Sequence, residues 1–159
     1  MTEASATAAG EKLVRKVLPA LLQPGERLIA ACRAMRPGQL GRQAAATLAD
    51  GTAGRRISHG GDSSGNALGF PGMVLTLTDR RLIALGQRGQ LRGRATREVR
   101  AIIDRPSVTS VETSGGRGPK LLQIALTLAD GRSAMVNVAR LDLKAGQALA
   151  EALRSQVAR

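Results

Sequence analysis

The chain's single histidine lies close to residues that could complete a nucleophilic triad. His59 is followed by Asp62, Ser63 and Ser64, and serine, histidine and aspartate are the side chains that such triads combine. A triad also needs a rigid framework that fixes the hydrogen bonds between its members. These residues lie instead in a stretch rich in Gly, Ser and Asn without apolar periodicity. We therefore expect no catalysis there and predict that the protein is not an enzyme.

Metal and cofactor chemistry also lack the side chains that they need. A metal site requires several converging ligands, whereas the chain has one histidine, one cysteine and scattered carboxylates. No phosphate-binding loop or dinucleotide fingerprint stands between a predicted strand and helix. We predict no catalytic residue, no metal and no cofactor. Cys32 lies in an apolar run and is interpreted as a small core residue, since one cysteine forms no disulfide within the chain.

Arginine is the residue type that points most directly to binding. The formal net charge is +12, which favours nucleic acid, an anionic membrane or an acidic protein as partner. Residues 73–106 contain eight arginines and three carboxylates. An excess of arginine over lysine also follows from GC-rich codons, so the charge has two explanations. The candidate surface for an anionic partner consists of Arg80, Arg81, Arg88, Arg92, Arg94, Arg97 and Arg100.

Alternating apolar residues predict two strands around the first two of these arginines, whereas residues 87–100 read as a basic, polar stretch. In the stretch MVLTLTDRRLIAL, two apolar runs flank Thr78–Arg81, which we interpret as the corner of a tight hairpin between strands 73–78 and 80–86. Asp79 can bond its own backbone at such a corner. We expect one arginine to lie along the sheet, with its stem packed and its head in water.

The remaining elements follow from the same reasoning. Asp130-Gly131 is a strong hairpin signal between two alternating runs. A helix with a kink or early stop near Pro19 is predicted close to the N-terminus, and a second begins at Asp142, which can cap it. The further expected strands are 27–36, 101–103, 108–111, 122–128 and 134–138, and the helices are 11–22 and 142–157.

These elements fit a single domain, residues 11–159, after a flexible tail at 1–10. Hairpin-linked strands followed by a helix indicate an antiparallel α+β fold. The chain has no Trp, no Tyr and one Phe, so Leu, Ile, Val, Ala and Met must build the core. Residues 38–69 are rich in Gly, Ser and Asn and are predicted to be a flexible or disordered insertion.

Several motifs together resemble the bacterial pleckstrin-homology-like (PH-like) domains, which are related in shape to GRAM domains. They are PGER at 24–27, LTLTDRRLIAL at 75–85, SVTSVE at 107–112, the Asp130-Gly131 hairpin and the C-terminal helix. The resemblance covers about residues 24–157, with 38–69 as an insertion. It implies a strongly bent antiparallel sheet of about seven strands, closed by the C-terminal helix, to which this chain adds an N-terminal helix.

Protein binding is the function that we predict. Sheet edges, and the groove beside a closing helix, can accept an extended segment or an acidic partner. Self-association through the N-terminal helix belongs to the same prediction, because the apolar stripe of that helix must be buried somewhere. The first 22 residues lack the uninterrupted apolar run of a signal peptide, since Arg15, Lys16 and Pro19 break it. We expect a bacterial cytoplasmic protein, and peripheral contact with the inner membrane would follow from the lipid alternative.

Two alternatives use the positive charge differently. One is peripheral binding to anionic lipid, to which each clustered arginine contributes about 1 kcal/mol. In eukaryotic relatives the usual phosphoinositide site is the loop between the first two strands, which is the Gly/Ser insertion here and has only Arg42, Arg55 and Arg56. The other is weak nucleic-acid binding through Arg92-Gly93-Arg94, although stacking platforms for single strands need aromatic side chains.

Overall fold

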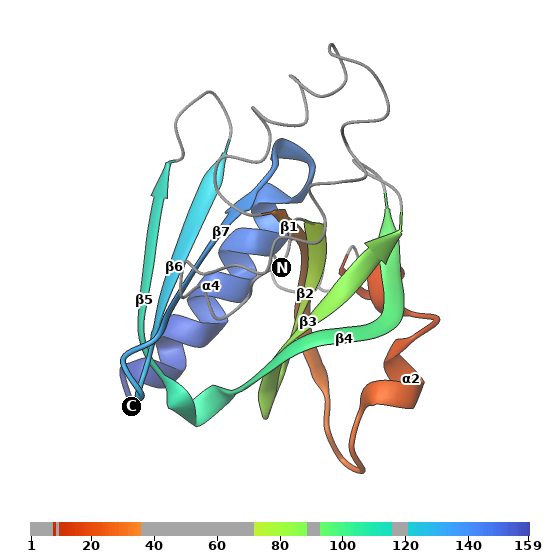
Figure 1. Cartoon of the computed structure of the whole chain (residues 1–159), viewed down its shortest axis with the longest axis horizontal. Coiled ribbons are helices and arrows are strands. Elements are labelled where there is room, and N and C mark those ends of the chain that lie inside the picture. The colour runs from red at the N-terminus through yellow and green to blue at the C-terminus, as the bar shows by residue number, and fades with distance from the viewer. Residues whose placement is uncertain (1–7, 9, 36–71, 89–92, 116–120) are drawn as a thin grey trace.

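The computed structural model describes residues 8, 10–35, 72–88, 93–115 and 121–159. Within these ranges the chain forms an antiparallel sheet of seven strands in the order β4-β3-β2-β1-β7-β6-β5. A long helix follows the last strand (Figure 1). The strands are β1 (Leu28–Met35), β2 (Gly72–Thr78), β3 (Arg81–Arg88), β4 (Arg94–Asp104), β5 (Val108–Gly115), β6 (Leu122–Leu128) and β7 (Ser133–Val138). The helices are α2 (Leu18–Leu21), the 3-10 turns η3 (Arg105–Ser107) and η4 (Arg140–Asp142), and α4 (Leu143–Val157).

The sheet consists of two meanders that meet at its centre. Strands β1 to β4 form one meander and β5 to β7 form the other. Among the described residues, the two are joined in register at Met35 of β1 opposite Asn137 of β7. Figure 1 shows the sheet bending around α4, which lies between the two meanders. The chain crosses from β4 to β5 through η3, which therefore links the two outermost strands of the sheet.

The inner face of the sheet packs against α4 to form the main core. Strand alternation supplies its apolar side chains, because every second residue points to the same face. From the helix, Leu149 and Leu153 are fully buried, and truncating either to alanine is expected to cost about 2–5 kcal/mol. The helix approaches so closely at Gly146 that a Cβ atom there would lie 2.9 Å from Val138 Cγ1. Cys32 belongs to this core and is fully buried, as predicted.

The N-terminal segment covers the outer face of the first meander. Residues 10–14 are helical, residues 15–17 form a turn, and α2 follows. Val14 and Val17 are buried in a second apolar cluster with Ala31, Val74, Ile83 and Leu85 of β1 to β3. The apolar stripe of the segment is therefore buried against the chain's own sheet, so its burial does not require a second copy of the protein.

The sequence predicts the element order well, with three corrections. The N-terminal helix is not continuous over 11–22, and its break at 15–17 precedes Pro19, which stands in the first turn of α2. Proline is tolerated there because the first amides of a helix have no partner within it. The predicted short strand 101–103 is the end of the eleven-residue β4, which includes the basic stretch from Arg94. The alternation of that stretch is hidden by two register shifts against β3.

The third correction concerns the start of α4. Asp142 occupies the N-cap position, but its side chain makes no capping hydrogen bond. Its carboxylate instead accepts hydrogen bonds from Arg33 Nε at 2.7 Å and Nη2 at 3.2 Å. This two-point ion pair fastens the start of the helix to β1.

Two structural expectations lie outside the described residues: the flexible tail at 1–10, except for residues 8 and 10, and the insertion at 38–69. Among the helices that are described, none combines the length and the apolar character that a bilayer crossing demands.

Candidate functional site

The TDRR corner between β2 and β3 is tied by a buried ion pair to Glu26, which lies in the connection between α2 and β1. The Glu26 side chain has no exposed surface and accepts hydrogen bonds from Arg81 Nε at 2.9 Å and from Arg81 Nη2 at 2.7 Å. The Thr78 hydroxyl donates to the same carboxylate at 2.6 Å, and the backbone amide of Gln23 donates at 2.8 Å. Arg81 also donates to the Leu21 carbonyl oxygen at 3.0 Å. Four donors therefore compensate the buried charge of Glu26.

This geometry sets the ionisation of the pair. The hydrogen bonds from Arg81, helped by those from Gln23 and Thr78, lower the pKa of Glu26 to about 2 against the opposing effect of burial. The bond to Glu26 in turn raises the pKa of Arg81. A charge-assisted, two-point pair of this kind is strong and geometrically specific, so the corner has a structural role.

The backbone of the corner is organised by Thr78 and Asp79. The Thr78 hydroxyl oxygen accepts the amides of Arg80 and Arg81 at 3.2 and 2.8 Å. The Asp79 carboxylate does not bond its own turn as predicted, but accepts the amide of Arg27 at 3.0 Å. The hairpin interpretation is confirmed. Of the two arginines at the corner, Arg80 is exposed, whereas the Arg81 side chain is 14% exposed and ion-paired.

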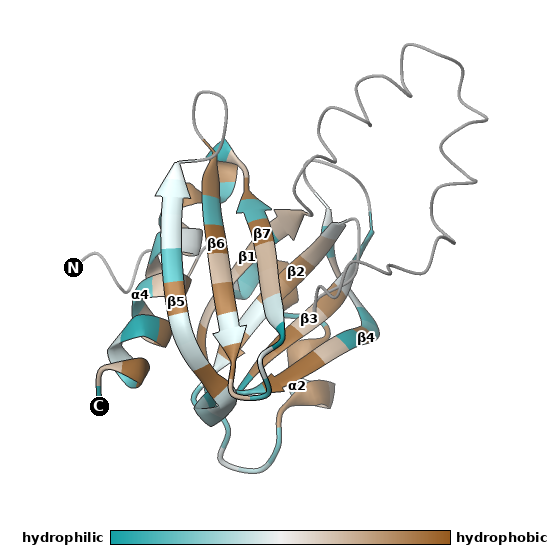
Figure 2. Ribbon diagram, turned by 60° about the vertical axis from the view of Figure 1, so that its left-hand side comes forward, coloured by the Kyte–Doolittle hydropathy of each residue, from teal (hydrophilic) through white to brown (hydrophobic). Residues whose placement is uncertain are grey.

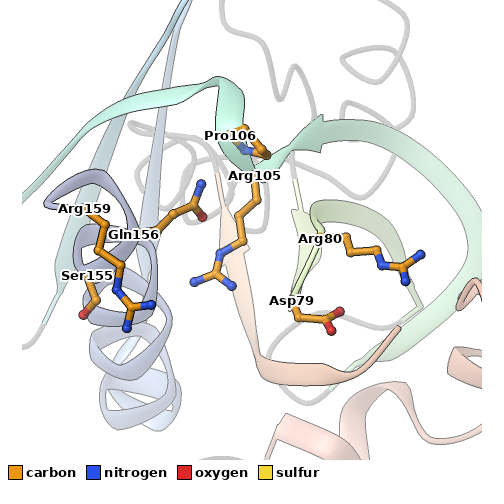
Figure 3. A pocket seen from close by; sticks show the side chains of 7 residues that line it. All are labelled: Asp79, Arg80, Arg105, Pro106, Ser155, Gln156 and Arg159. Atoms are coloured by element: carbon orange, nitrogen blue, oxygen red, sulfur yellow. The ribbon is translucent and has the colours of Figure 1, made fainter. Parts of the chain in front are cut away.

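A pocket of about 470 Å³ lies where η3 meets the end of α4. Arg105 is central to it: its Nη2 donates to the Ala152 carbonyl oxygen at 2.7 Å, so it caps a turn of the helix. Its buried Nε finds no hydrogen-bond acceptor in the part of the chain that the structure describes, and burial lowers its pKa, although Asp79 opposes this effect. The lining residues are Asp79, Arg80, Arg105, Pro106, Ser155, Gln156 and Arg159 (Figure 3).

The pocket does not focus its arginines on one point. Figure 3 shows the Arg80 side chain directed away from Arg105, with Asp79 between them. Arg105 is already hydrogen-bonded to the Ala152 carbonyl oxygen of α4. The carboxylate of Asp79 offsets part of the positive charge of the arginines that line the pocket. We therefore assign this pocket a structural role at the junction of η3 and the end of α4.

The seven predicted arginines do not form one surface. Arg81 is in the buried ion pair, and Arg100 donates to Glu98 at 3.0 Å. Arg80 is exposed at the corner, while Arg88 and Arg94 face each other in register at the far ends of β3 and β4. The two other members of the predicted set are Arg97, which is exposed on β4, and Arg92, which lies outside the described residues.

The two edges of the sheet differ, and the sequence did not reveal this difference. The β4 edge is interrupted by two register shifts and exposes Arg94 and Arg97. Strand β5 has one register shift against β6, between Val108 and Ser110, and pairs residue for residue from Ser110 to Gly115. Glu112 is the one charged residue in its sequence VTSVETSG. Proteins commonly protect edge strands with bulges and with charged side chains. By this criterion β4 is protected and β5 is open to pairing.

The other residues considered for chemistry are Cys32, which is part of the core, and the group around His59, which lies outside the described residues. Burial raises the pKa of the Cys32 thiol to about 12, so this thiol is not reactive at neutral pH. His59, Asp62, Ser63 and Ser64 lie outside the described residues. The ranges that are described contain no group of three or more His, Cys, Asp or Glu side chains that would hold a metal ion. No family model matches the sequence, and no curated protein does.

Proposed function

We propose that this protein is a non-enzymatic, PH-like binding module of the bacterial cytoplasm that captures an extended segment of a partner protein along β5. The observation that carries the proposal is the open β5 edge. A strand at the end of a sheet has a row of backbone donors and acceptors available to an incoming strand, and strand addition of this kind is a common mode of peptide recognition.

The fold supports the PH-like assignment. A single bent antiparallel sheet whose two meanders flank a helix that follows the last strand is the arrangement that the sequence resemblance implies. The helix also lies beside the proposed binding edge, because Arg154 of α4 donates from Nη2 to the Thr113 hydroxyl at 3.0 Å. An incoming segment would therefore meet β5 on one side and α4 on the other.

Charge favours an acidic segment. Arg154 is 44% exposed and shares its guanidinium between Thr113 and Glu151. An exposed arginine at the edge can pair with a carboxylate of the partner, and the net charge of +12 accelerates encounter with acidic proteins. Rim charges of this kind act on the association rate and on specificity more than on affinity.

Site-specific photo-crosslinking tests the proposal. A photoreactive amino acid replaces Glu112 on β5, and a matched control replaces Asp130, which is exposed on the β6–β7 turn. We expect a partner adduct from position 112 and none from position 130. The captured partner should then protect β5 amides from hydrogen exchange and leave β4 amides unchanged. Protection of β4 in place of β5 would contradict the assignment of the edge.

A further inference from the structure

The outer side of the molecule carries apolar surface that the fold leaves exposed. In helix α2, Leu18 and Leu21 are half-buried against the second apolar cluster, and Pro19 and Ala20 are exposed. On β4, Val99 and Ile102 are 41% and 51% exposed. They pair with Leu85 and Ile83, which pack under the N-terminal segment, so both residues face the same outer side as α2. Figures 1 and 2 show α2 next to β4 in both views.

Positive charge borders this apolar surface on the side of the N-terminal segment. Val14 and Val17 point into the sheet. At 3.6 residues per turn, the opposite side of residues 10–17 carries Lys12, Arg15 and Lys16, which are all exposed. The exposure of these residues therefore gives the segment an apolar side that is already buried and a cationic side that faces outward.

Strand β4 adds a fourth cation. Ala95 packs against the outer cluster, and the exposed Arg97 stands between Ala95 and Val99 in the alternation of the strand. Three carboxylates, Glu11, Glu98 and Asp104, are also exposed on these elements, and Glu98 is ion-paired with Arg100. Cations are therefore in excess around an aliphatic centre formed by α2, Val99 and Ile102, which we call the outer patch.

We infer that the outer patch docks on the surface of an anionic lipid bilayer. Aliphatic side chains flanked by lysine and arginine are what interfacial helices place at the boundary between headgroups and acyl chains. Each basic residue near an anionic surface contributes about 1 kcal/mol. The docking surface is distinct from the β5 edge and from the arginines 80 to 100 that the sequence suggested, of which it includes Arg97 alone.

The composition of the chain allows a direct test of insertion. The protein contains no Trp and no Tyr, so a single introduced tryptophan reports its own surroundings alone. Ile102→Trp places the reporter in the outer patch. Leu141→Trp, at a residue that is 63% exposed on η4, is the matched control.

The two reporters are titrated with vesicles of phosphatidylglycerol and phosphatidylcholine, and with phosphatidylcholine alone. We expect the Ile102→Trp emission to shift to the blue, and to be quenched by brominated lipid, on the anionic vesicles only. Leu141→Trp should not respond. No response at position 102, or an equal response at both positions, would overturn the inference. A lack of response at position 102 would instead favour an acidic protein as the partner of the outer patch.

Charge variants separate the outer patch from the general positive charge. Changing Lys12, Arg15 and Lys16 together to Gln should weaken binding to anionic vesicles about 100-fold, given the contribution of each cation. The control changes Arg132, Arg140 and Lys144 to Gln, which removes the same charge from exposed positions elsewhere. Equal losses in the two variants would overturn the inference. Far-UV circular dichroism checks that both variants remain folded.

Discussion

The two ends of the β2–β3–β4 meander use arginine in opposite ways. At the corner, the Arg81 side chain is largely buried and forms an ion pair with the fully buried Glu26. At the far end, Arg88 and Arg94 face each other across the ladder while exposed to solvent. One cationic stretch of sequence therefore contains both a structural arginine and surface arginines. The difference lies in the surrounding dielectric, because a charge removed from water needs a fixed counter-charge and a surface charge does not.

Removing the buried arginine should have the largest effect. Arg81→Met leaves the Glu26 carboxylate buried without its main partner, and we expect the free energy of unfolding to fall by about 3–5 kcal/mol. Urea denaturation measures this change. The double variant Glu26→Gln/Arg81→Met should recover part of the loss, because it removes both charges. No recovery would mean that Arg81 acts through packing and its bond to Leu21.

Acid should break the same ion pair. An unfolded Glu26 binds a proton near pH 4.5 and the folded one near pH 2, so the unfolded state takes up the proton first as the pH falls. The contribution of Glu26 to stability is therefore complete above about pH 5 and is lost progressively as the pH falls towards 2. Unfolding free energies measured over this range should decline less steeply in Glu26→Gln than in the wild-type protein. Equal slopes would show that other carboxylates account for acid unfolding.

The buried hydroxyl of Thr76 is a polar group without a hydrogen-bond partner in the described part of the chain. Thr76 is fully buried on the outer face of β2, and its Oγ1 has no hydrogen-bond partner within the described ranges. Thr76→Val keeps the shape and the β-branch and removes this unpaired polar atom, so we expect a gain of about 1 kcal/mol. Thr78→Val is the contrasting variant, because its hydroxyl donates to Glu26, and it should destabilise the protein. Thermal unfolding of both variants measures the two signs.

The surface arginines should give the smallest effect. Like charges directly opposite in an antiparallel ladder are destabilising by about 0.2–1 kcal/mol, so Arg94→Gln should leave stability unchanged or raise it slightly. The measurement is urea denaturation at low and high salt, because screening should remove any gain. A loss above about 1 kcal/mol would show that the far end of the meander is as structurally constrained as the corner.

The sequence predicts strands and hairpins well where one local cause determines them. Alternation at 122–128 and the Asp130-Gly131 turn are examples, and the positive φ of 84° at Gly131 accounts for the glycine. The same holds for Cys32, whose apolar neighbours predicted its burial. In contrast, β4 was recognised only at its end, because its register shifts break the period of two on which the prediction depended.

The candidate site was predictable to a smaller extent, because partners in space are distant in sequence. Glu26 and Arg81 are 55 positions apart, and nothing in the TDRR motif indicates which arginine is buried. The open β5 edge depends on strand order, which no local pattern encodes.

The short pairing between β1 and β7, which the described residues show at Met35 and Asn137, has a mechanical consequence. The two meanders share little backbone, and α4, which packs on strands of both, is the main element that clamps them together. Without the helix, the two meanders could separate by rotating about the contact between Met35 and Asn137. Under stretching force from the C-terminus, the helix should therefore peel off first and the meanders should then yield one after the other.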